Sequence, residues 1–567
     1  MAVETKICKN CKQQFTIEPE DFQFYEKIKV PAPTWCSRCR QERRLTFFNL
    51  INLYKRKCDL CKKDSISMYP PEAPYTIYCP KCWWGDGWDP FSYGRDYDFS
   101  RPFFDQLNEL WHQTPLLGLS IGQYALVTSP YTNHSDHLKN CYLIFWADFS
   151  EDCAYGFFVF KNKMLFDCSC LLSCELSYDL FHAHKVARSI GSYDLLESLN
   201  CAFLRDSENC QDCFASANLR GKKYHFFNKP LSKEHYFEEL KKYNLGSYRN
   251  YEEAKRQAEE HWKKFPPRPV YEKFAVNSTG NRIYESKNCK ECFEVAGVEN
   301  GKYLSLLYQK PVSDCYDLSG WGNNMSLCYE CGVVGENVSN IKFSQESGIT
   351  LHDVEYGKLS IGGGHHFGCV SVKKGEYCIL NKRYEKAEYE KLRAKIIDHM
   401  NSMPYTDKQG RVYKYGEFFP PEFSPLAYNE TIANKFFSLS KNEILARGYR
   451  YREPDTREYA ITMPAKELPD HIKDAPDSIL NEVVGCGACP RGFKIIKAEL
   501  DFLRQMNLPL PRRCPFCRIE EKLDKWVKES RLVKRSCDKC GVEFETPHTK
   551  EEVAYILCKK CWRVEFS

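Results

Sequence analysis

The sequence contains no run of 18 apolar residues, which is the length that a membrane-spanning helix requires. The first six residues, Met1 to Lys6, also lack the apolar region of a secretory signal peptide. We therefore expect a cytoplasmic protein that does not bind a membrane. In such a reducing compartment, closely spaced cysteine pairs more often hold metal than form disulfides.

Signatures of catalysis are scarce as well. The segment 362–366, Gly-Gly-Gly-His-His, lacks the strand–helix context of a phosphate loop or of a hydrolase oxyanion loop. We expect it to form a loop or a turn of a repeat. No pair of acidic residues is distinguished from the dozens of others, so an enzyme acting on sugar or nucleic acid in a groove is only our third hypothesis.

Cysteine, by contrast, is abundant, with 31 residues in 567. Sixteen of these form eight CxxC pairs, which are grouped two by two into four sets. Near each end of the chain, a set with a longer interval between its two pairs is followed by a set with a shorter interval, and both intervals are the same at the two ends. Four thiolates complete a tetrahedral zinc shell and leave no position for catalytic water. A redox role would not explain the repeated spacing. The predicted zinc ligands are Cys8, Cys11, Cys36 and Cys39; Cys58, Cys61, Cys79 and Cys82; Cys486, Cys489, Cys514 and Cys517; and Cys537, Cys540, Cys558 and Cys561.

The net charge argues against extensive nucleic-acid contact. The formal charge is +5, and each Zn(Cys)4 site adds −2, so that four sites change it to −3. A local case remains at basic segments close to aromatic residues, namely Phe47, Phe48, Tyr54 and Trp526. The candidate nucleic-acid-binding residues are Arg40, Arg43, Arg44, Lys55, Arg56, Lys57, Lys534 and Arg535. The alternative is that these aromatic side chains pack inward.

The central region contains a second repeat. Residues 219–231 match residues 372–384 around an Asn-Lys pair, and Tyr236 and Tyr389 follow after the same interval. Upstream of each copy, Asn or Asp repeatedly precedes Cys at short, irregular intervals. Asn and Asp tolerate unusual backbone angles at corners, and Cys packs well in a core. We therefore predict two β-solenoid-like repeats with cysteine ladders inside.

The central cysteines leave one alternative open. Most are explained as small buried side chains, but three CxxC pairs lie among them. Two of these pairs, Cys289 with Cys292 and Cys328 with Cys331, have the composition of a fifth zinc site.

Helices are predicted between these parts. One begins near Ser100 with an apolar face, two charged helices span 233–242 and 386–400, another ends near Lys264, and a short one is capped by Ser440 and ended by Gly448. The predicted order is a double zinc module (1–95), a helical connector (96–120), a first solenoid-like repeat (121–230), a helical connector (231–268), a second repeat (269–384), a helix with a Pro- and Tyr-rich linker (385–483), and a duplicate zinc module (484–567).

The Cys-x-x-Cys-Arg helix start at Cys36 and the Cys-x-x-Cys-Trp ending at Cys79 resemble treble-clef and zinc-ribbon domains. The whole chain resembles uncharacterised multi-zinc-ribbon and treble-clef zinc-finger proteins. This resemblance implies zinc but no activity. We expect a multidomain α+β protein with no enzymatic role that binds nucleic acid or a nucleoprotein through its terminal modules. The alternative is a zinc-stabilised scaffold that binds a protein partner. The sequence does not specify an oligomeric state.

Overall fold

The computed structural model describes residues 3–122, 126–454 and 459–566. The chain forms two compact units, each assembled from two separate segments. Unit 1 contains residues 1–123 and 270–453, and unit 2 contains residues 124–269 and 454–567. Each terminal cysteine module thus belongs to the same unit as the central segment that lies farther from it in the sequence.

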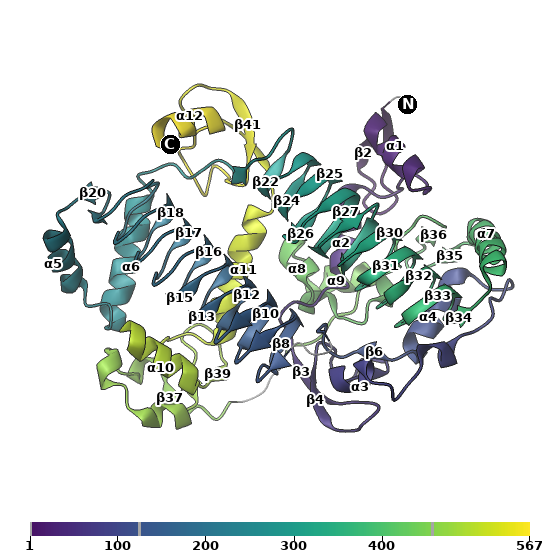
Figure 1. Ribbon diagram of the computed structural model, residues 1–567, viewed down its shortest axis with the longest axis horizontal. Coiled ribbons are helices and arrows are strands. Elements are labelled where there is room, and N and C mark those ends of the chain that lie inside the picture. The colour runs from purple at the N-terminus through teal and green to yellow at the C-terminus, as the bar shows by residue number, and fades with distance from the viewer. Residues whose placement is uncertain (1–2, 123–125, 455–458, 567) are drawn as a thin grey trace. The chain divides into compact units, whose positions relative to one another are not determined.

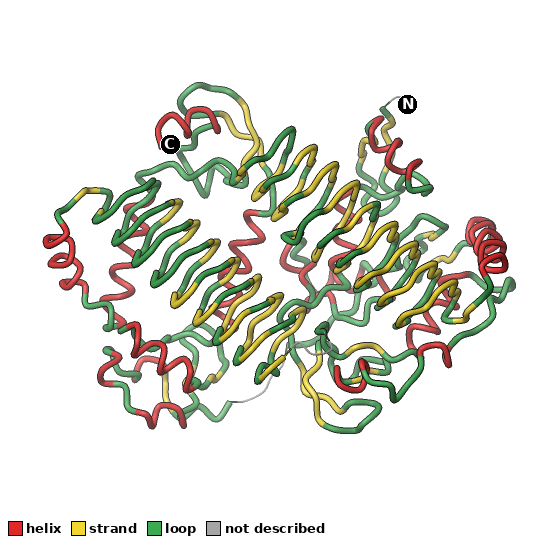
Figure 2. The backbone as a smooth tube through the Cα atoms, in the orientation of Figure 1, coloured by secondary structure: helices red, strands yellow, loops and turns green. Residues whose placement is uncertain are grey.

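Unit 2 contains a sheet of short parallel strands, which Figures 1 and 2 show as successive layers joined by loops. We call this sheet the unit 2 stack. Its strands are β7 (Leu126–Val127), β8 (Thr132–Ser135), β9 (Leu138–Lys139), β10 (Tyr142–Asp148), β11 (Ser150–Glu151), β12 (Ala154–Phe160), β13 (Lys163–Phe166), β14 (Ser169–Leu172), β15 (Glu175–Tyr178), β16 (Phe181–His184), β17 (Tyr193–Leu196) and β18 (Arg205–Glu208).

The layers of the unit 2 stack repeat at a constant interval along the chain. Tyr142 pairs with Ala154, and Tyr193 pairs with Arg205 across the same interval. Every third residue from His134 to Phe227 has a positive φ. Equivalent residues of neighbouring layers are 12 apart, so each layer turns at four corners. The Asn and Asp residues that precede cysteine occupy such positions. Short polar side chains are the residues that best tolerate this conformation after glycine.

The residue after each corner points into a narrow core. These core positions therefore also recur every third residue, and they are filled by small or aliphatic side chains, Cys141, Cys153, Leu165, Cys174, Leu195 and Cys210 among them. The core serines satisfy their hydroxyls within the stack. Ser189 donates to the carbonyl of Ala187 and accepts the N–H of Cys201 in the next layer. Buried hydroxyls therefore keep hydrogen-bond partners, which limits the penalty of burying them.

Unit 1 contains a second sheet of this kind, the unit 1 stack. Its strands are β21 (Glu272–Lys273), β22 (Gly280–Tyr284), β23 (Lys287–Lys290), β24 (Cys292–Ala296), β25 (Val298–Lys302), β26 (Ser305–Leu307), β27 (Val312–Gly322), β28 (Met325–Ser326), β29 (Tyr329–Gly335), β30 (Val338–Lys342), β31 (Gly348–Glu355), β32 (Ile361–Phe367), β33 (Lys373–Ile379) and β34 (Lys382–Arg383). All pairings are parallel except the last, between β33 and β34.

The unit 1 stack is less regular than the unit 2 stack. In its first layers Gly280 pairs with Cys292, which is the same interval as in unit 2. Farther along, Tyr316 pairs with Tyr329 across an interval that is longer by a single residue. The additional residues gather at one corner, where two consecutive residues have positive φ: Asn323 and Asn324, Glu336 and Asn337, and Ile349 and Thr350.

The repeated Asn-Lys pair ends both stacks in the same way. In unit 2 it joins β19 (His225–Phe226) to β20 (Lys229–Pro230), and in unit 1 it joins β33 to β34. The side-chain amide of Asn228 exchanges two hydrogen bonds with the backbone of Ala217, and Asn381 does so with Val370. Each Asn thus holds a terminal antiparallel turn against the preceding layer.

Each unit also contains helices. Unit 1 has α1 (Pro19–Lys27), α2 (Ser37–Leu45), α3 (Pro80–Trp84), α4 (Phe103–Gln113), α7 (Lys386–Ser402), α8 (Ile432–Phe436) and α9 (Lys441–Ala446). Unit 2 has α5 (Lys233–Tyr243), α6 (Tyr248–Trp262), α10 (Lys497–Met506), α11 (Pro515–Glu529) and α12 (Lys559–Phe566). The expected helices near Ser100 and after Ser440 correspond to α4 and α9, and Ser440 with Glu443 forms the expected capping box. Within the described residues, no helix is long and apolar enough to cross a bilayer.

The remaining strands are short and lie mainly beside the cysteine pairs. In unit 1 they are β1 (Glu4–Ile7), β2 (Gln14–Ile17), β3 (Tyr54–Lys57), β4 (Asp64–Ser67), β5 (Ile77–Tyr78), β6 (Leu116–Leu117), β35 (Tyr405–Thr406) and β36 (Val412–Tyr413). In unit 2 they are β37 (Met463–Pro464), β38 (Val484–Gly485), β39 (Gly492–Phe493), β40 (Val533–Ser536) and β41 (Glu543–Thr546). The fold is therefore mixed α and β, with a sheet-rich centre.

Candidate metal centres

The sixteen paired cysteines gather into four groups in the described part of the chain. Each group holds four thiols whose sulfur atoms all lie within 4.8 Å of one another. The first two groups belong to unit 1 and the other two to unit 2. The groups contain the predicted ligands: Cys8, Cys11, Cys36 and Cys39; Cys58, Cys61, Cys79 and Cys82; Cys486, Cys489, Cys514 and Cys517; and Cys537, Cys540, Cys558 and Cys561.

The same local structure positions the thiols in every group. The first CxxC pair lies in a turn between two antiparallel strands, as between β1 and β2 or between β40 and β41. The second pair lies at the start of a helix, where Cys36, Cys79 and Cys514 are the N-cap residues of α2, α3 and α11. Free N–H groups at a helix start favour negative charge, which suits thiolate ligands.

One hydrogen bond recurs in all four groups. The backbone N–H of the first cysteine of the helical pair donates to the first sulfur of the turn. The donor–acceptor distances are 3.2 Å for Cys36 to Cys8, 3.2 Å for Cys79 to Cys58, 3.2 Å for Cys514 to Cys486 and 3.3 Å for Cys558 to Cys537. Burial raises the thiol pKa of Cys58, but backbone N–H groups outweigh burial and lower it to about 7. The same balance lowers the pKa of Cys486 to about 7 and that of Cys537 to about 6.

The distances between the sulfur atoms fit a tetrahedrally coordinated metal ion. They are 3.8 Å between Cys11 and Cys36, 3.7 Å between Cys489 and Cys514, and 3.8 Å between Cys540 and Cys558. A disulfide would bring the two sulfurs to about 2 Å, whereas zinc–sulfur bonds of about 2.3 Å in a tetrahedron place sulfurs about 3.8 Å apart. The four groups therefore have the donor set and the dimensions to hold zinc and fit zinc-ribbon-like modules.

In unit 1 the helix that follows the first group lies on the unit 1 stack. Helix α2 packs on β27 and β29 and carries three of the arginines that the sequence assigns to nucleic-acid binding. All three are buried: Arg40, Arg43 and Arg44 are 2%, 1% and 2% exposed. These arginines are therefore removed from any nucleic-acid surface, which corrects the assignment made from the sequence.

Carboxylates of the unit 1 stack pair with these arginines. Arg40 donates twice to Asp317, at 3.0 and 2.8 Å, and Arg44 donates to the other oxygen of Asp317 at 3.1 Å. Arg43 donates to Glu330 at 2.6 Å and to Glu417 at 3.1 Å. Asp317 and Glu330 are corner residues of adjacent layers, with positive φ. Burial raises the pKa of Glu330, and the arginines oppose that shift by stabilising its charge.

In unit 2 the helix after the third group makes the corresponding contacts. Helix α11 packs on β12. Arg518 pairs with Asp167 and, at 3.1 Å, with Glu499 of α10. Lys522 donates to Asp179 at 2.6 Å, and Lys255 of α6 donates to the second oxygen of Asp179 at 2.9 Å. Asp167 and Asp179 are again corner residues one layer apart.

The aromatic residues near these helices also point inward. Phe47 and Phe48 are each 3% exposed and Trp526 is 2% exposed, so these three follow the inward-packing alternative, whereas Tyr54 is half-buried. Sequence reasoning missed the carboxylates Asp317, Glu330, Asp167 and Asp179. Of these, only Asp167 lies at a corner that the sequence predicts, because it precedes a cysteine.

The other predicted basic residues divide into two sets. Arg56 donates to Asp59 and to the carbonyl of Pro70, and Arg535 donates to the carbonyls of His548 and Val553. These two arginines hold their own modules together. Lys55, Lys57 and Lys534 are exposed on β3 and β40.

The cysteines of the predicted fifth zinc site do not come together as a group of four within the described residues. Cys289, Cys292, Cys328 and Cys331 are all buried in the core of the unit 1 stack. Each thiol instead donates to the carbonyl two residues earlier, at distances from 3.2 to 3.6 Å. Cysteine is used here as a small core residue.

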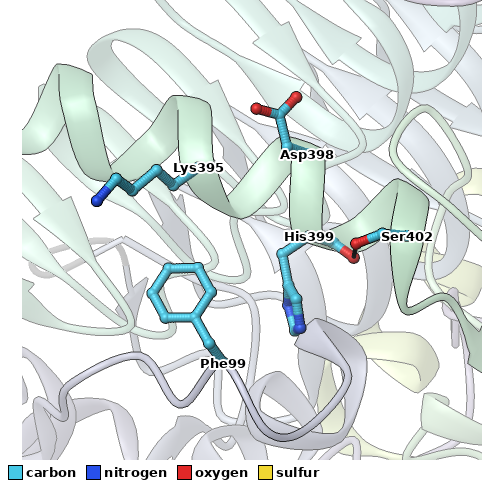
Figure 3. A pocket seen from close by; sticks show the side chains of 5 residues that line it. All are labelled: Phe99, Lys395, Asp398, His399 and Ser402. Atoms are coloured by element: carbon cyan, nitrogen blue, oxygen red, sulfur yellow. Dashed lines mark hydrogen bonds between the residues drawn. The ribbon is translucent and has the colours of Figure 1, made fainter.

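A surface hollow of unit 1 lies beside the C-terminal half of α7. Figure 3 shows Phe99, Lys395, Asp398, His399 and Ser402 around it. The His399 imidazole lies 2.8 Å from the Tyr97 hydroxyl, and the Ser402 hydroxyl donates to the backbone carbonyl of His399. The serine is thus turned away from the imidazole, so these residues do not form a nucleophile–base pair.

No protein-family model matches the chain, and no curated protein matches it.

Proposed function

We propose that the protein is a non-enzymatic, zinc-stabilised scaffold that binds a protein partner. In this proposal, the two stacks are β-solenoids that arose by duplication, and the helix of one treble-clef module locks each of them. The second cysteine group of each unit forms a zinc ribbon. The observation that carries the proposal is the burial of Arg40, Arg43 and Arg44 against carboxylates of the unit 1 stack.

Several features support the solenoid and duplication parts of this proposal. Parallel strands recur at nearly constant intervals in both units. Both stacks end in the same Asn-clamped turn. In both, a cationic helix pairs with carboxylates at the corners of neighbouring layers. Solenoids expose unpaired strand edges and faces, so that covering elements are needed for solubility.

In this proposal, zinc is required for folding and takes no part in a chemical reaction. Each cysteine group supplies four ligands, which leaves no open position for a substrate. Metal binding to such groups drives folding of the surrounding segment, because the ligands converge only in the folded state. The start of α2 lies in the first group, so bound metal would also position Arg40 to Arg44 on the unit 1 stack.

Nucleic-acid binding is the second candidate because the three lysines of the predicted set are on the surface. Lys55, Lys57 and Lys534 project from the hairpins of the second and fourth cysteine groups. Exposed lysines contact phosphate without reading sequence. This surface is smaller than the eight-residue set that the sequence predicts, and three of the aromatic residues predicted to stack on bases, Phe47, Phe48 and Trp526, are buried.

A salt series distinguishes the two candidates. Labelled single-stranded RNA and duplex DNA are titrated with intact, zinc-loaded protein at increasing salt, and binding is followed by fluorescence anisotropy. The scaffold proposal predicts no saturable binding even at low salt. Binding whose logarithm falls linearly with log salt would overturn it and report the number of phosphate contacts.

A matched pair of variants assigns any binding to the zinc ribbons. The test variant combines Lys55→Ala, Lys57→Ala and Lys534→Ala. The control combines Lys241→Ala, Lys391→Ala and Lys466→Ala, three exposed lysines outside the cysteine groups with the same total charge change. Loss of binding in the test variant alone would establish the second candidate. Equal loss in both would attribute the binding to surface lysines in general and would rule out the zinc ribbons as its site.

A further inference from the structure

A cluster of two histidines and one aspartate lies on the surface of the unit 1 stack. His352 and Asp353 belong to β31, and His365 belongs to β32. One ligand atom from each lies within 4.8 Å of the others. The His352 Nδ1 atom is 3.0 Å from Asp353 Oδ2, and the His365 Nδ1 atom is 3.9 Å from the same oxygen. The side chains of His352, Asp353 and His365 are 43%, 42% and 30% exposed, so an ion and its waters have access.

The repeat geometry brings these residues together. Asp353 and His365 occupy the same corner of adjacent layers, and both have positive φ. Tyr377 follows at the same corner of the next layer, and its ring stacks on the His365 imidazole at 4.5 Å with an interplanar angle of 3°. The His352 ring meets the His365 ring edge-on at 5.1 Å. The two imidazoles are therefore held in fixed orientations.

Gly364 makes room for His352. Gly364 lies directly beside His352 in the neighbouring strand, and Glu376 lies beside Gly364 in the strand after it. A Cβ atom at position 364 would lie 2.2 Å from Cε1 of His352 and 2.5 Å from its Nδ1. The imidazole thus occupies the space that any side chain there would fill. From this position its Nε2 is 3.8 Å from a carboxylate oxygen of Glu376.

A further hydrogen bond orients the Asp353 carboxylate. The side-chain amide of Asn340, one layer earlier, donates to Oδ1 of Asp353. This leaves Oδ2, the oxygen nearest both imidazoles, directed at the cluster. Hydrogen bonds that fix the second atom of a ligand are typical of metal sites, where their loss lowers affinity about 10- to 100-fold.

We propose that His352, Asp353 and His365 form a binding site for a divalent transition-metal ion, with Glu376 as a further ligand within reach. Two imidazoles and one carboxylate suit Zn²⁺, Ni²⁺, Cu²⁺ or Fe²⁺ better than Mg²⁺ or Ca²⁺, which prefer oxygen. The site differs in kind from the four cysteine groups because its donors are nitrogen and oxygen and it leaves coordination positions for water or a ligand. It is independent of the proposed scaffold function.

The experiment uses Ni²⁺ and the full-length, zinc-loaded protein. Isothermal titration calorimetry with Ni²⁺ measures affinity, and the zinc content is determined before and after, so that displacement from cysteine is recognised. One saturable site is expected with all thiolate zinc retained. His352→Gln, Asp353→Asn and His365→Gln should each weaken binding at least about tenfold, because each deletes one of three ligands.

Two further variants separate a built site from scattered surface histidines. Gly364→Ala deletes no ligand but displaces the His352 ring, and it should also weaken Ni²⁺ binding. The control is His137→Gln in unit 2, where an exposed imidazole stacks on Phe149 beside Asp136 and Asp148. This control should bind as the unchanged protein does. Absence of a saturable site, or equal affinity in the His352, His365 and His137 variants with unaltered circular dichroism, would overturn the proposal.

Discussion

Helices α2 of unit 1 and α11 of unit 2 can be compared position by position after Cys39 and Cys517. At equivalent positions, α2 has Arg40, Arg43 and Arg44, and α11 has Arg518, Glu521 and Lys522. The first and third of these positions are cationic in both units, and in both they pair with corner carboxylates of a stack. The middle position reverses its charge. Arg43 is covered by Glu330 and Glu417, whereas Glu521 is exposed and pairs with Arg513. Contact with the stack therefore determines which charges recur.

The partners of the two helices differ as well. In unit 1, Arg40 donates twice to Asp317, which also accepts a hydrogen bond from Arg44. In unit 2, Arg518 has two carboxylates, Asp167 and Glu499. In unit 1 one carboxylate thus serves two arginines, whereas in unit 2 one arginine has two carboxylates. The following changes test this difference, from the largest expected effect to the smallest.

Removing ligands from the first cysteine group should have the largest effect. Cys36→Ser combined with Cys39→Ser should release one zinc and unfold the first module, since metal binding at such sites supplies roughly 10–16 kcal/mol. Zinc content and hydrogen exchange measure the two outcomes. The matched change Cys514→Ser with Cys517→Ser should affect unit 2 in the same way while sparing unit 1. An unchanged zinc content would refute these ligands.

Deleting the shared carboxylate of unit 1 comes next. Asp317→Ala leaves Arg40 without its carboxylate partner in a buried site, and such a change typically destabilises by about 3–5 kcal/mol. Asp167→Ala in unit 2 should have a smaller effect, because Arg518 keeps Glu499. Urea unfolding followed by hydrogen exchange in each unit compares the two. Equal losses would show that the charge distribution is not what distinguishes the units.

Acid should weaken unit 2 through Asp179. Burial raises the pKa of Asp179, but Lys255 and Lys522 outweigh burial and hold it below its usual value. The unfolded chain therefore takes up the proton first as the pH falls, so this contribution to stability is present above about pH 4 and is lost below it. Urea midpoints at pH 5, 4 and 3 should fall less steeply in Asp179→Asn than in the unchanged protein. Parallel slopes would contradict the assignment.

The smallest effect is expected where the two helices differ. Glu521→Arg gives unit 2 the charge pattern of unit 1 at an exposed position, and surface substitutions usually change stability by less than about 0.5 kcal/mol. Arg43→Glu is the reverse exchange, and it should destabilise unit 1 strongly because it places a third carboxylate beside Glu330 and Glu417. Thermal unfolding of both variants measures the asymmetry.

The sequence was sufficient for the features that depend on local chemistry. The four cysteine groups follow from CxxC spacing, and the corners follow from Asn and Asp before cysteine, as at Asn140 and Asp152. The sequence prediction missed the recurrence at every third residue because it assigned only cysteine and aromatic residues to the inward positions. Serine, alanine and leucine occupy the same inward positions and complete the pattern.

Other features depend on contacts that are remote in the sequence. The arginines of α2 resemble a phosphate-binding set until Asp317 is placed beside them, and that residue lies 277 positions away. The histidine cluster was also missed. Segment 362–366 was expected to be a loop or a turn of a repeat. It lies in β32 and includes the corner residue His365, and its role depends on register with His352 and Asp353.

The interleaving of the two units has a consequence for synthesis. Because Arg40 precedes Asp317 by 277 residues, a ribosome adding about 5–20 residues per second finishes the first partner roughly 15–55 seconds before the second. During that interval the emerging amino-terminal helix carries three guanidinium groups without their stack carboxylates. Early zinc loading would keep this nascent segment compact while the rest of its unit is still being translated.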